Sequence, residues 1–345
     1  MGCLTMHDST KIGLLPEEVR NLDVEVVVIC SAYNQERYIS DALDGFVSQK
    51  TEFSYIVLVH DDASLDGTSR IIREYERKYP DIIKGIYEVE NQYRKGNYYW
   101  YKEYLIQTNA KYLALCEGDD YWIDEEKLQA QFDTLESDEN GVFCFTNAMK
   151  ISATDGRELG AMLPSSREDS SILSCGGKLS ADAVIRLNFI PTASFFARID
   201  IWLQEPKLPK EAFGGDRAHQ LFMAIRGNSY YIDRSTTVYR IASEGSMMES
   251  WGKSRAARLR AIQSYVSLYE YFDEYTNGRY RTSTKSFDDD KRLSLMFATG
   301  ERGILSRKDA VQAAKARGVK WLFLLLLFYC SPAIVKLIWE GRFKA

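Results

Sequence analysis

The stretch VEVVVIC, residues 24–30, is a nearly continuous apolar run, and the polar segment SAYN, residues 31–34, follows it directly. Two further short apolar runs occupy residues 55–60 and 112–116. Continuous rather than alternating apolar runs are typical of strands that are buried on both faces, as in a parallel sheet covered by helices. The three runs therefore predict three neighbouring strands of a parallel sheet.

Amphipathic segments lie between the predicted strands. In residues 36–48 the apolar side chains fall on one helical face, and residues 66–79 show the same spacing. Asp66 is a candidate N-cap of the second helix, and Pro80 marks its exit. Strands that alternate with helices predict an α/β fold with right-handed crossovers.

Each predicted strand ends in a polar cluster. Residues 31–34 follow the first strand, Asp61 and Asp62 follow the second, and EGDD, residues 117–120, follows the third. Ligands of open parallel sheets bind outside the carboxyl ends of the strands. We therefore expect the three clusters to converge on one crevice.

Crowded carboxylates are unfavourable unless a cation or protons offset their charge. Mg²⁺ and Mn²⁺ prefer carboxylate ligands, and Mg²⁺ sites usually combine one or two carboxylates with substrate phosphates. The chain has only three histidines, which argues against a histidine-rich metal site. The acidic pairs at adjacent strand ends therefore indicate a Mn²⁺ or Mg²⁺ site completed by a diphosphate.

Three ordered segments are similar to one known family: VVVICSAYNQERYISDAL at residues 26–43, HDDASLDGT at residues 60–68 and LCEGDDYW at residues 115–122. Together they resemble the nucleotide-binding half of a family-2 glycosyltransferase with the GT-A fold. The resemblance implies a mostly parallel central sheet flanked by helices, with a helical C-terminal extension. We expect a leader at residues 1–23, a GT-A domain at 24–245 divided near residue 146 into nucleotide and acceptor halves, and a helical region at 246–345.

The resemblance also implies roles for individual residues. The nucleotide-binding candidates are Ser31, Tyr33, Asn34, Asp62, Glu117, Asp119 and Arg240. Asp62 would accept a hydrogen bond from the base, which favours uridine. Asp119 and Asp120 are both metal candidates, and the sequence does not distinguish between them. Asp66 matches a second acid of the motif, with helix capping as the alternative role.

The general base is expected on an acid that precedes a helix. Asp216 follows Phe213-Gly214-Gly215 and opens a predicted helix, so the resemblance assigns it this role, and the helix N-terminus favours its ionised form. Simple N-capping is the alternative. Arg240 would neutralise the diphosphate or form a structural ion pair. Ala242 stands where family members often carry a histidine, which puts a histidine role in doubt.

Several assignments remain open between packing and function. His60 and His219 are interpreted as packing or surface residues. The aromatic segment 98–101 suits either sugar stacking or a core helix face. Residues 321–339 are apolar, with Trp321 and Trp339 at the ends and basic residues outside them. This pattern favours peripheral contact with the cytosolic face of a membrane, with a buried helix or an oligomer contact as the alternative.

We therefore expect a cytoplasmic, metal-dependent, inverting hexosyltransferase. It would move a single sugar from a nucleotide-diphosphate sugar, with UDP favoured, to a glycan, polysaccharide or lipid-linked acceptor. The QxxRW motif of processive synthases is absent from the sequence, and the net charge of −5 gives no reason to expect a nucleic-acid partner. The alternatives are a catalytically inactive binding subunit of the same family and a nucleotide-sugar nucleotidyltransferase.

Overall fold

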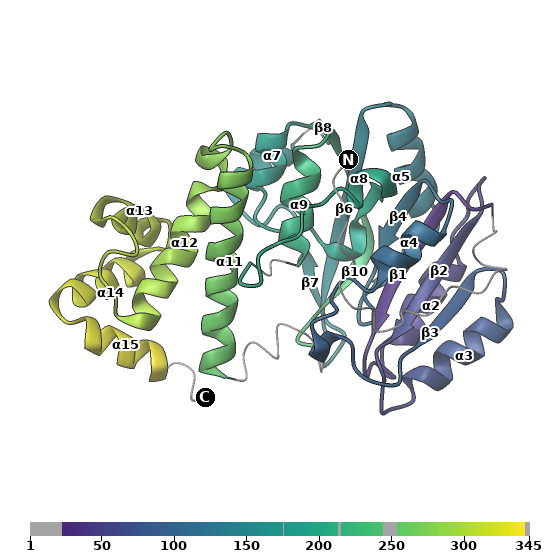
Figure 1. The fold of residues 1–345 in the computed structure, drawn as a ribbon, viewed down its shortest axis with the longest axis horizontal. Coiled ribbons are helices and arrows are strands. Elements are labelled where there is room, and N and C mark those ends of the chain that lie inside the picture. The colour runs from purple at the N-terminus through teal and green to yellow at the C-terminus, as the bar shows by residue number, and fades with distance from the viewer. Residues whose placement is uncertain (1–22, 175, 213–214, 244–253, 342–345) are drawn as a thin grey trace, which may run out of the picture.

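The computed structural model describes residues 23–174, 176–212, 215–243 and 254–341. These residues form one mostly parallel sheet with helices on both faces, followed by a C-terminal group of helices (Figure 1). Residues 1–22 of the leader predicted at 1–23, and residues 246–253 at the start of the predicted helical region, lie outside the described residues. The predicted fold class is confirmed.

The sheet has ten strands in the described chain, ordered β3-β2-β1-β4-β9-β6-β10-β5, with β7 paired to β6 and β8 paired to β10. Their bounds are β1 (Val26–Ala32), β2 (Tyr55–Asp61), β3 (Ile83–Tyr87), β4 (Tyr112–Leu115), β5 (Tyr121–Trp122), β6 (Gly141–Ser152), β7 (Glu158–Ala161), β8 (Gly177–Leu179), β9 (Phe196–Arg198) and β10 (Asn228–Ile241). Strands β1, β2 and β4 correspond to the three predicted strands.

The helices of the sheet domain are α2 (Ile39–Val47), α3 (Thr68–Lys78), α4 (Tyr101–Gln107), α5 (Lys127–Glu136), α6 (Arg167–Leu173), α7 (Ala181–Arg186), α8 (Ile199–Trp202) and α9 (Asp216–Ala224). The C-terminal helices are α11 (Arg255–Tyr275), α12 (Arg281–Thr299), α13 (Arg307–Arg317), α14 (Val319–Cys330) and α15 (Pro332–Gly341). In Figure 1, α11 and α12 stand between the sheet domain and the last three helices.

Parallel pairing fixes the edge of the sheet where the polar clusters meet. Strand β1 pairs in parallel with β2 on one side and with β4 on the other. Strand β9 is antiparallel to both β4 and β6, so β6 and its parallel neighbour β10 run in the direction of β4. The carboxyl ends of β1, β2, β4, β6 and β10 therefore face the same side.

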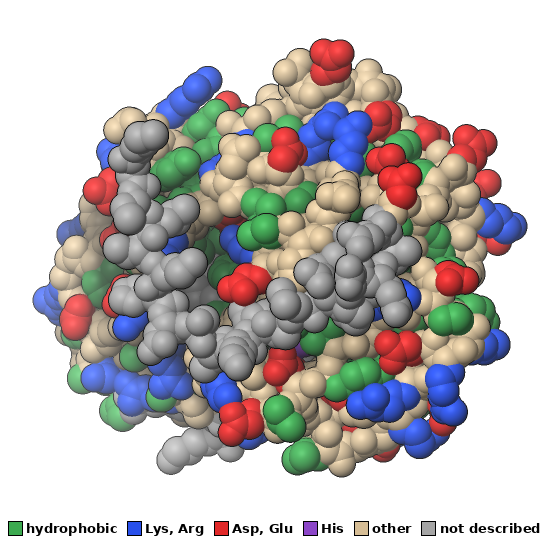
Figure 2. Space-filling view, turned by 45° about the vertical axis from the view of Figure 1, so that its right-hand side comes forward, with side chains coloured by type: hydrophobic (Ala, Val, Ile, Leu, Met, Phe, Trp, Pro, Cys, Tyr) green, Lys and Arg blue, Asp and Glu red, His purple; other side chains and the backbone are tan. Residues whose placement is uncertain are grey.

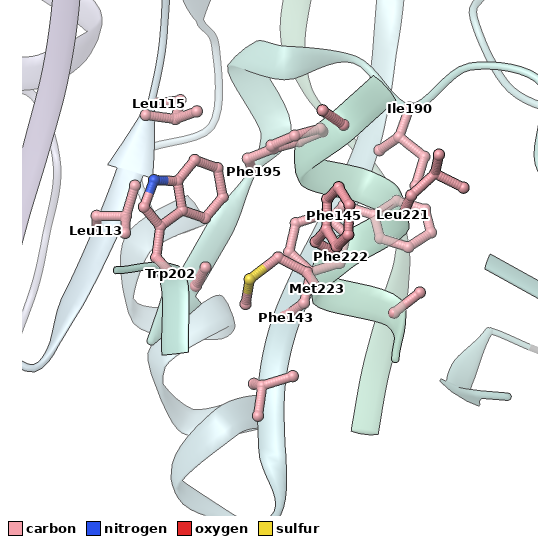
Figure 3. Close-up of a cluster of buried hydrophobic side chains, with 14 of the residues drawn as sticks. Leu113, Leu115, Phe143, Phe145, Ile190, Phe195, Trp202, Leu221, Phe222 and Met223 are labelled. Carbon is pink, nitrogen blue, oxygen red and sulfur yellow. The ribbon is translucent and has the colours of Figure 1, made fainter. Parts of the chain in front are cut away.

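Alternating side chains of β1 enter two separate apolar cores. Val27 and Ile29 belong to the core that α4, α7, α9 and α11 cover, whereas Val26 and Val28 belong to the core under α2, α3 and α5. The strand is buried on both sides, and this explains its continuous apolar sequence. Figure 3 shows part of the first core, in which Leu221, Phe222 and Met223 of α9 lie against Phe143 and Phe145 of β6.

One local prediction needs correction. The N-cap of α3 is Gly67 rather than Asp66, although the Asp66 side chain still accepts the Thr68 N–H at 3.0 Å. The apolar C-terminal segment forms two helices, because α14 ends before Pro332, which opens α15. Among the described residues, no helix has both the length and the apolar character needed to cross a bilayer.

A lysine is wholly buried in the second core. The Lys127 side chain is fully inaccessible, its Nζ donates to Gln131 Oε1 at 2.7 Å, and it lies 4.1 Å from the centroid of the Trp122 ring. Burial lowers the pKa of Lys127 to about 7. An unfolded lysine keeps its proton to about pH 10, so folding releases a proton between these two values.

We therefore predict that Lys127→Met flattens the pH dependence of stability. Between pH 7 and 10 the unfolded chain binds the proton that the folded chain lacks, so this lysine makes the free energy of unfolding rise with pH. The difference in the free energy of unfolding between the parent and the variant should change by about 1 kcal/mol per pH unit. Denaturant unfolding at several pH values would measure it. Lys50→Met, at an exposed ion pair, is the control and should show no such change.

Candidate functional site

Main-chain hydrogen bonds tie the three polar loops together at the carboxyl edge of the sheet. Asp62 N donates to Ala32 O at 2.9 Å, and Gly118 N donates to Ser31 O at 3.0 Å. The loop after β1 is thus bonded to the loops after β2 and β4. These main-chain bonds place the three polar clusters next to one another, as the sequence predicted.

Side chains then lock the first two loops against each other. Asn34 accepts from Leu65 N at 2.8 Å through Oδ1, and its own N–H donates to Ser64 Oγ at 2.9 Å. Asp66 Oδ2 accepts from Glu36 N at 3.1 Å, while Oδ1 of the same carboxylate holds the first turn of α3. Asp66 therefore joins the loops and also accepts the N–H of Thr68, the first residue of α3.

Asp62 is buried and organises the following loop. Its two carboxylate oxygens accept the N–H groups of Gln92 and Tyr93, the latter at 3.1 Å. A carboxylate can accept more than two hydrogen bonds, so a base contact is compatible with these bonds. The base contact of Asp62 stays a prediction.

The aromatic segment 98–101 divides between core and surface. The indole of Trp100 is buried, stacks on the His60 ring with 4.2 Å between centroids, and donates to Ser31 Oγ at 3.1 Å. Tyr101 is also buried, whereas Tyr98 is exposed. Tyr33 lies beside Arg94, whose guanidinium donates to its hydroxyl at 3.4 Å.

Gly118 holds the acidic loop close to the first strand. A methyl group at this position would lie 2.4 Å from Gln35 Oε1, 2.8 Å from Ile39 Cδ1 and 3.3 Å from Ala32 Cβ. The absence of a side chain therefore lets the loop carry Glu117 and Asp119 directly above the end of β1. This close approach is a packing reason for glycine between two acids.

Arg240 and Ser243 hold the two aspartates of this loop in different ways. Asp120 is almost wholly buried and accepts the Arg240 N–H at 2.9 Å. Asp119 is only partly buried and accepts from Ser243 Oγ at 2.7 Å. The Arg240 guanidinium bonds Asp119 O at 2.6 Å and the Asp41 carboxylate. A diphosphate contact by Arg240, which stays a prediction, would compete with that ion pair.

Asp216 reaches the same crevice from the start of α9. Its Oδ2 accepts from the hydroxyl of Thr192, which lies in the short 3₁₀ helix η2 (Thr192–Ser194). Burial raises the pKa of Glu117 well above its usual range, and the nearby charges of Asp216, Asp119 and Asp120 raise it further. The structure thus brings Asp216 together with an acidic loop about 100 residues earlier in the chain.

The carboxylates of the crevice favour protonation or a cation. Burial, reinforced by Asp119, raises the pKa of Asp120, and the Arg240 N–H opposes that rise. Within the described ranges, no three side chains of His, Cys, Asp and Glu are arranged to hold a metal alone. The donor set fits a metal that one carboxylate and substrate phosphates share. Asp119 fits that role better than Asp120, because it is the less buried of the two.

Backbone strain marks the same edge. Four described residues other than glycine have a positive φ, and three of them follow strand ends: Asn34 (53°), Ala63 (60°) and Ala242 (62°). Such conformations cost on the order of 1–3 kcal/mol and cluster at ligand and active sites. They support placing the functional site at the carboxyl ends of β1, β2 and β10.

Thr192, Ser243 and Asp41 contact the candidate site residues, and the sequence analysis did not identify them. Thr192 lies in no quoted motif, and Asp41 lies in the segment 26–43 without a role assigned to it; their partners lie 24 and 199 residues away in the chain. Of these three residues, only Ser243 could have been identified from the sequence, because it lies three residues after Arg240, just after the last strand.

The surface in Figure 2 shows acidic and basic side chains intermixed rather than a continuous basic face.

The comparisons identify related sequences and folds. The family model described as glycosyl transferase family 2 matches residues 27–177. An uncharacterized protein of Mycobacterium tuberculosis is 32% identical over 252 residues, which are 69% of this chain and 68% of that protein.

Two solved structures share the fold at 15% identity. TarS 1–349 of S. aureus, in complex with UDP-GlcNAc, superposes with a TM-score of 0.55 over 93% of this chain and 91% of that chain. The mannosyltransferase PcManGT of Pyrobaculum calidifontis, in complex with GDP-Man and Mn²⁺, gives a TM-score of 0.50 over 92% and 88%. The fold shared with both is the GT-A glycosyltransferase fold.

We predict that Gly118→Ala destabilises the protein by about 1 kcal/mol, because the added methyl group displaces the ends of the Gln35 and Ile39 side chains and lies close to Ala32 Cβ. Chemical denaturation would measure the loss. Gly341→Ala is the control, since a methyl group there meets no atom within 4 Å and should be neutral. Equal stability of the two variants would contradict the packing role of Gly118.

Proposed function

Because the chain belongs to glycosyl transferase family 2, we propose that it moves one sugar from a UDP-sugar to an acceptor hydroxyl with inversion at the anomeric carbon. The observation that supports the proposal is the position of Asp216, at the start of α9, near enough to the acidic loop 117–120 for its charge to raise the pKa of Glu117. This arrangement offers a proton acceptor near the carboxylates that would hold a metal-bound diphosphate. The UDP-GlcNAc complex of a protein with the same fold supports the choice of a nucleotide-sugar donor.

In the proposed reaction the acceptor oxygen attacks the anomeric carbon of the sugar as the bond from that carbon to the diphosphate oxygen breaks. Asp216 takes the proton of the acceptor hydroxyl, and the nucleoside diphosphate leaves with the bonding electron pair. Thr192 holds one oxygen of Asp216 and leaves the other for the acceptor. The start of α9 favours the ionised carboxylate that a base needs.

We assign Asp119 as the direct metal ligand and Asp120 as the residue that fixes the loop through Arg240. A bound Mn²⁺ or Mg²⁺ would supply charge stabilisation for the departing diphosphate. The crowded, partly buried carboxylates provide hard oxygen donors of the kind these ions take. The Mn²⁺ complex of PcManGT supports this choice of metal.

We also propose that the enzyme acts at the cytosolic face of a membrane, on a glycan or lipid-linked acceptor. Apolar side chains at helical spacing on α14 are exposed: Val319 (82%), Phe323 (66%) and Leu326 (66%). Leu337 of α15 is exposed as well. Residues 300–345 carry nine Lys and Arg but three Asp and Glu, although the whole chain is acidic. An apolar face on a basic segment suits an anionic lipid surface.

The two tryptophans expected at the membrane interface have inward contacts instead. The rings of Trp321 and Trp339 lie 6.0 Å apart between centroids, and both contact Phe297 of α12. The proposed lipid contact therefore rests on the exposed stripe of α14 and not on the tryptophans.

The donor assignment predicts Mn²⁺-dependent binding of UDP, measured by titration calorimetry. Asp119→Asn should weaken this binding at least tenfold, because it removes the charge of the proposed ligand. Asp120→Asn, which can still accept the Arg240 N–H, should bind close to the parent. The reverse order would move the metal ligand to Asp120. Failure of UDP, GDP and dTDP to bind folded protein would refute the proposed donor.

For the membrane proposal we predict that the protein sediments with vesicles of phosphatidylglycerol and phosphatidylcholine. The double variant Phe323→Ser, Leu326→Ser should bind at least tenfold more weakly, since each buried apolar side chain contributes about 1.5–3 kcal/mol. Val89→Ser, at a residue 95% exposed on the sheet domain, is the matched control. Equal sedimentation of parent and double variant would exclude this face as the contact.

A further inference from the structure

A buried polar chain lies directly behind Asp216. The ring of His219 uses both nitrogens: Nδ1 lies 2.9 Å from Glu205 Oε1, and Nε2 lies 3.2 Å from the Tyr101 hydroxyl. The three residues come from α9, from the segment after α8 and from α4. The sequence analysis interpreted His219 as a packing or surface residue, yet its ring connects three separate parts of the fold.

The surroundings hold this ring in one orientation. It stacks on Trp202 with 4.1 Å between centroids, and the Tyr99 ring meets it edge-on at 5.6 Å. Figure 3 shows Trp202 beside Leu113 and Leu115 of β4, so the stack rests on the central sheet. The second oxygen of Glu205 is held by Lys102 Nζ at 3.3 Å.

The chain is coupled to Asp216 through the first turn of α9. His219 follows Asp216 by three residues, a spacing that puts both side chains on one face of the helix. Burial raises the pKa of Asp216, and the hydrogen bond from the Thr192 hydroxyl opposes that rise. His219 thus lies one turn after the carboxylate that Thr192 holds, on the same face of α9.

Packing alone does not account for a carboxylate and an imidazole at this place. The side chains of Glu205 and His219 are 5% and 6% exposed, and apolar groups of the same volume usually stabilise a core at least as well as a buried ion pair. Burial would raise the pKa of Glu205, but His219 and Lys102 keep it below its usual value. Glu205 is therefore an ionised acceptor that requires a proton on His219 Nδ1.

We propose that His219, clamped between Glu205 and Tyr101, is a positioning residue that fixes the first turn of α9 and supports the ionised carboxylate of Asp216. This inference rests on the proposed function, because it takes Asp216 as the base. It adds Glu205 and Tyr101 as the partners that set the orientation of the His219 ring.

The ring geometry can be tested without any substrate. The chain has three histidines, His7, His60 and His219, so a protein labelled with ¹⁵N-histidine gives three ring systems, and His219→Gln identifies the relevant one. We expect Nδ1 of His219 to carry a proton in the parent protein at neutral pH. An unprotonated Nδ1 would overturn the clamp by Glu205 and with it the inference.

The effect on Asp216 can be tested by turnover. The measurement is UDP or GDP release by the full chain with Mn²⁺, using a panel of UDP-GlcNAc, UDP-glucose, UDP-galactose and GDP-mannose. Asp216→Asn gives the effect of losing the base, expected at 10²- to 10⁴-fold in kcat. His219→Gln and the isosteric Glu205→Gln should each lower kcat by about ten- to hundredfold, which is less than the loss expected for Asp216→Asn. The KM for the donor should not change.

Gln220→Leu is the matched control on the same helix. Gln220 is equally buried, and its amide donates to the carbonyls of Val184 and Leu187 on the α7 side. It should lower thermal stability without a selective loss of kcat. If His219→Gln behaves like Gln220→Leu, His219 is only structural and the inference is wrong.

The outcomes separate this inference from the proposed function. Full turnover in Asp216→Asn removes the base assignment and both conclusions fall together. Loss of turnover in Asp216→Asn with retained turnover in His219→Gln and Glu205→Gln overturns the inference alone. If no donor of the panel turns over, the proposed donor class fails, and the protonation of His219 Nδ1 still decides for or against the clamp.

Discussion

Four carboxylates lie close together at the carboxyl edge of the sheet: those of Glu117, Asp119, Asp120 and Asp216. Their mutual electrostatic repulsion is the constraint on this site, and the surrounding hydrogen bonds offset it. Asp120 is held by the Arg240 N–H, Asp119 by Ser243, and Asp216 by Thr192. For Glu117, burial and the charges of its acidic neighbours all raise the pKa, and no neighbouring group lowers it. Neutral hydrogen-bond donors fix the geometry but leave the negative charge in place, which keeps the crevice attractive to a cation.

The sequence predicted the elements that depend on local periodicity. The continuous apolar runs at β1, β2 and β4 identify buried strands, and parallel pairing then brings their loops together. Asp216 could be placed at the start of a helix, and its role came from a family resemblance. The contacts of Thr192, Ser243 and Asp41 were out of reach, because hydrogen bonds between distant segments leave no periodic pattern in the chain. The contacts of His219 were out of reach for the same reason, since its partners Glu205 and Tyr101 are set by tertiary packing.

The C-terminal helices illustrate how a hydrophobic segment divides between a core and a surface. Leu324, Leu325 and Phe328 of α14 are buried with residues of α12 and α13, while the opposite stripe of the same helix is exposed. Composition alone cannot separate these two stripes. The break before Pro332 also shortens the segment into two helices, which pack against each other.

Strand β9 has a consequence for how the protein can change over evolution. Only three residues long and antiparallel, it is the sole strand placed between β4 and β6 in the described sheet. Strands on its two sides do not share a register directly, so an insertion or deletion beyond β9 need not shift β1, β2 or β4. Strand β6 can therefore change in length while β1, β2 and β4 keep their alignment, and β5, through its pairing with β10, is the link that such a change must preserve.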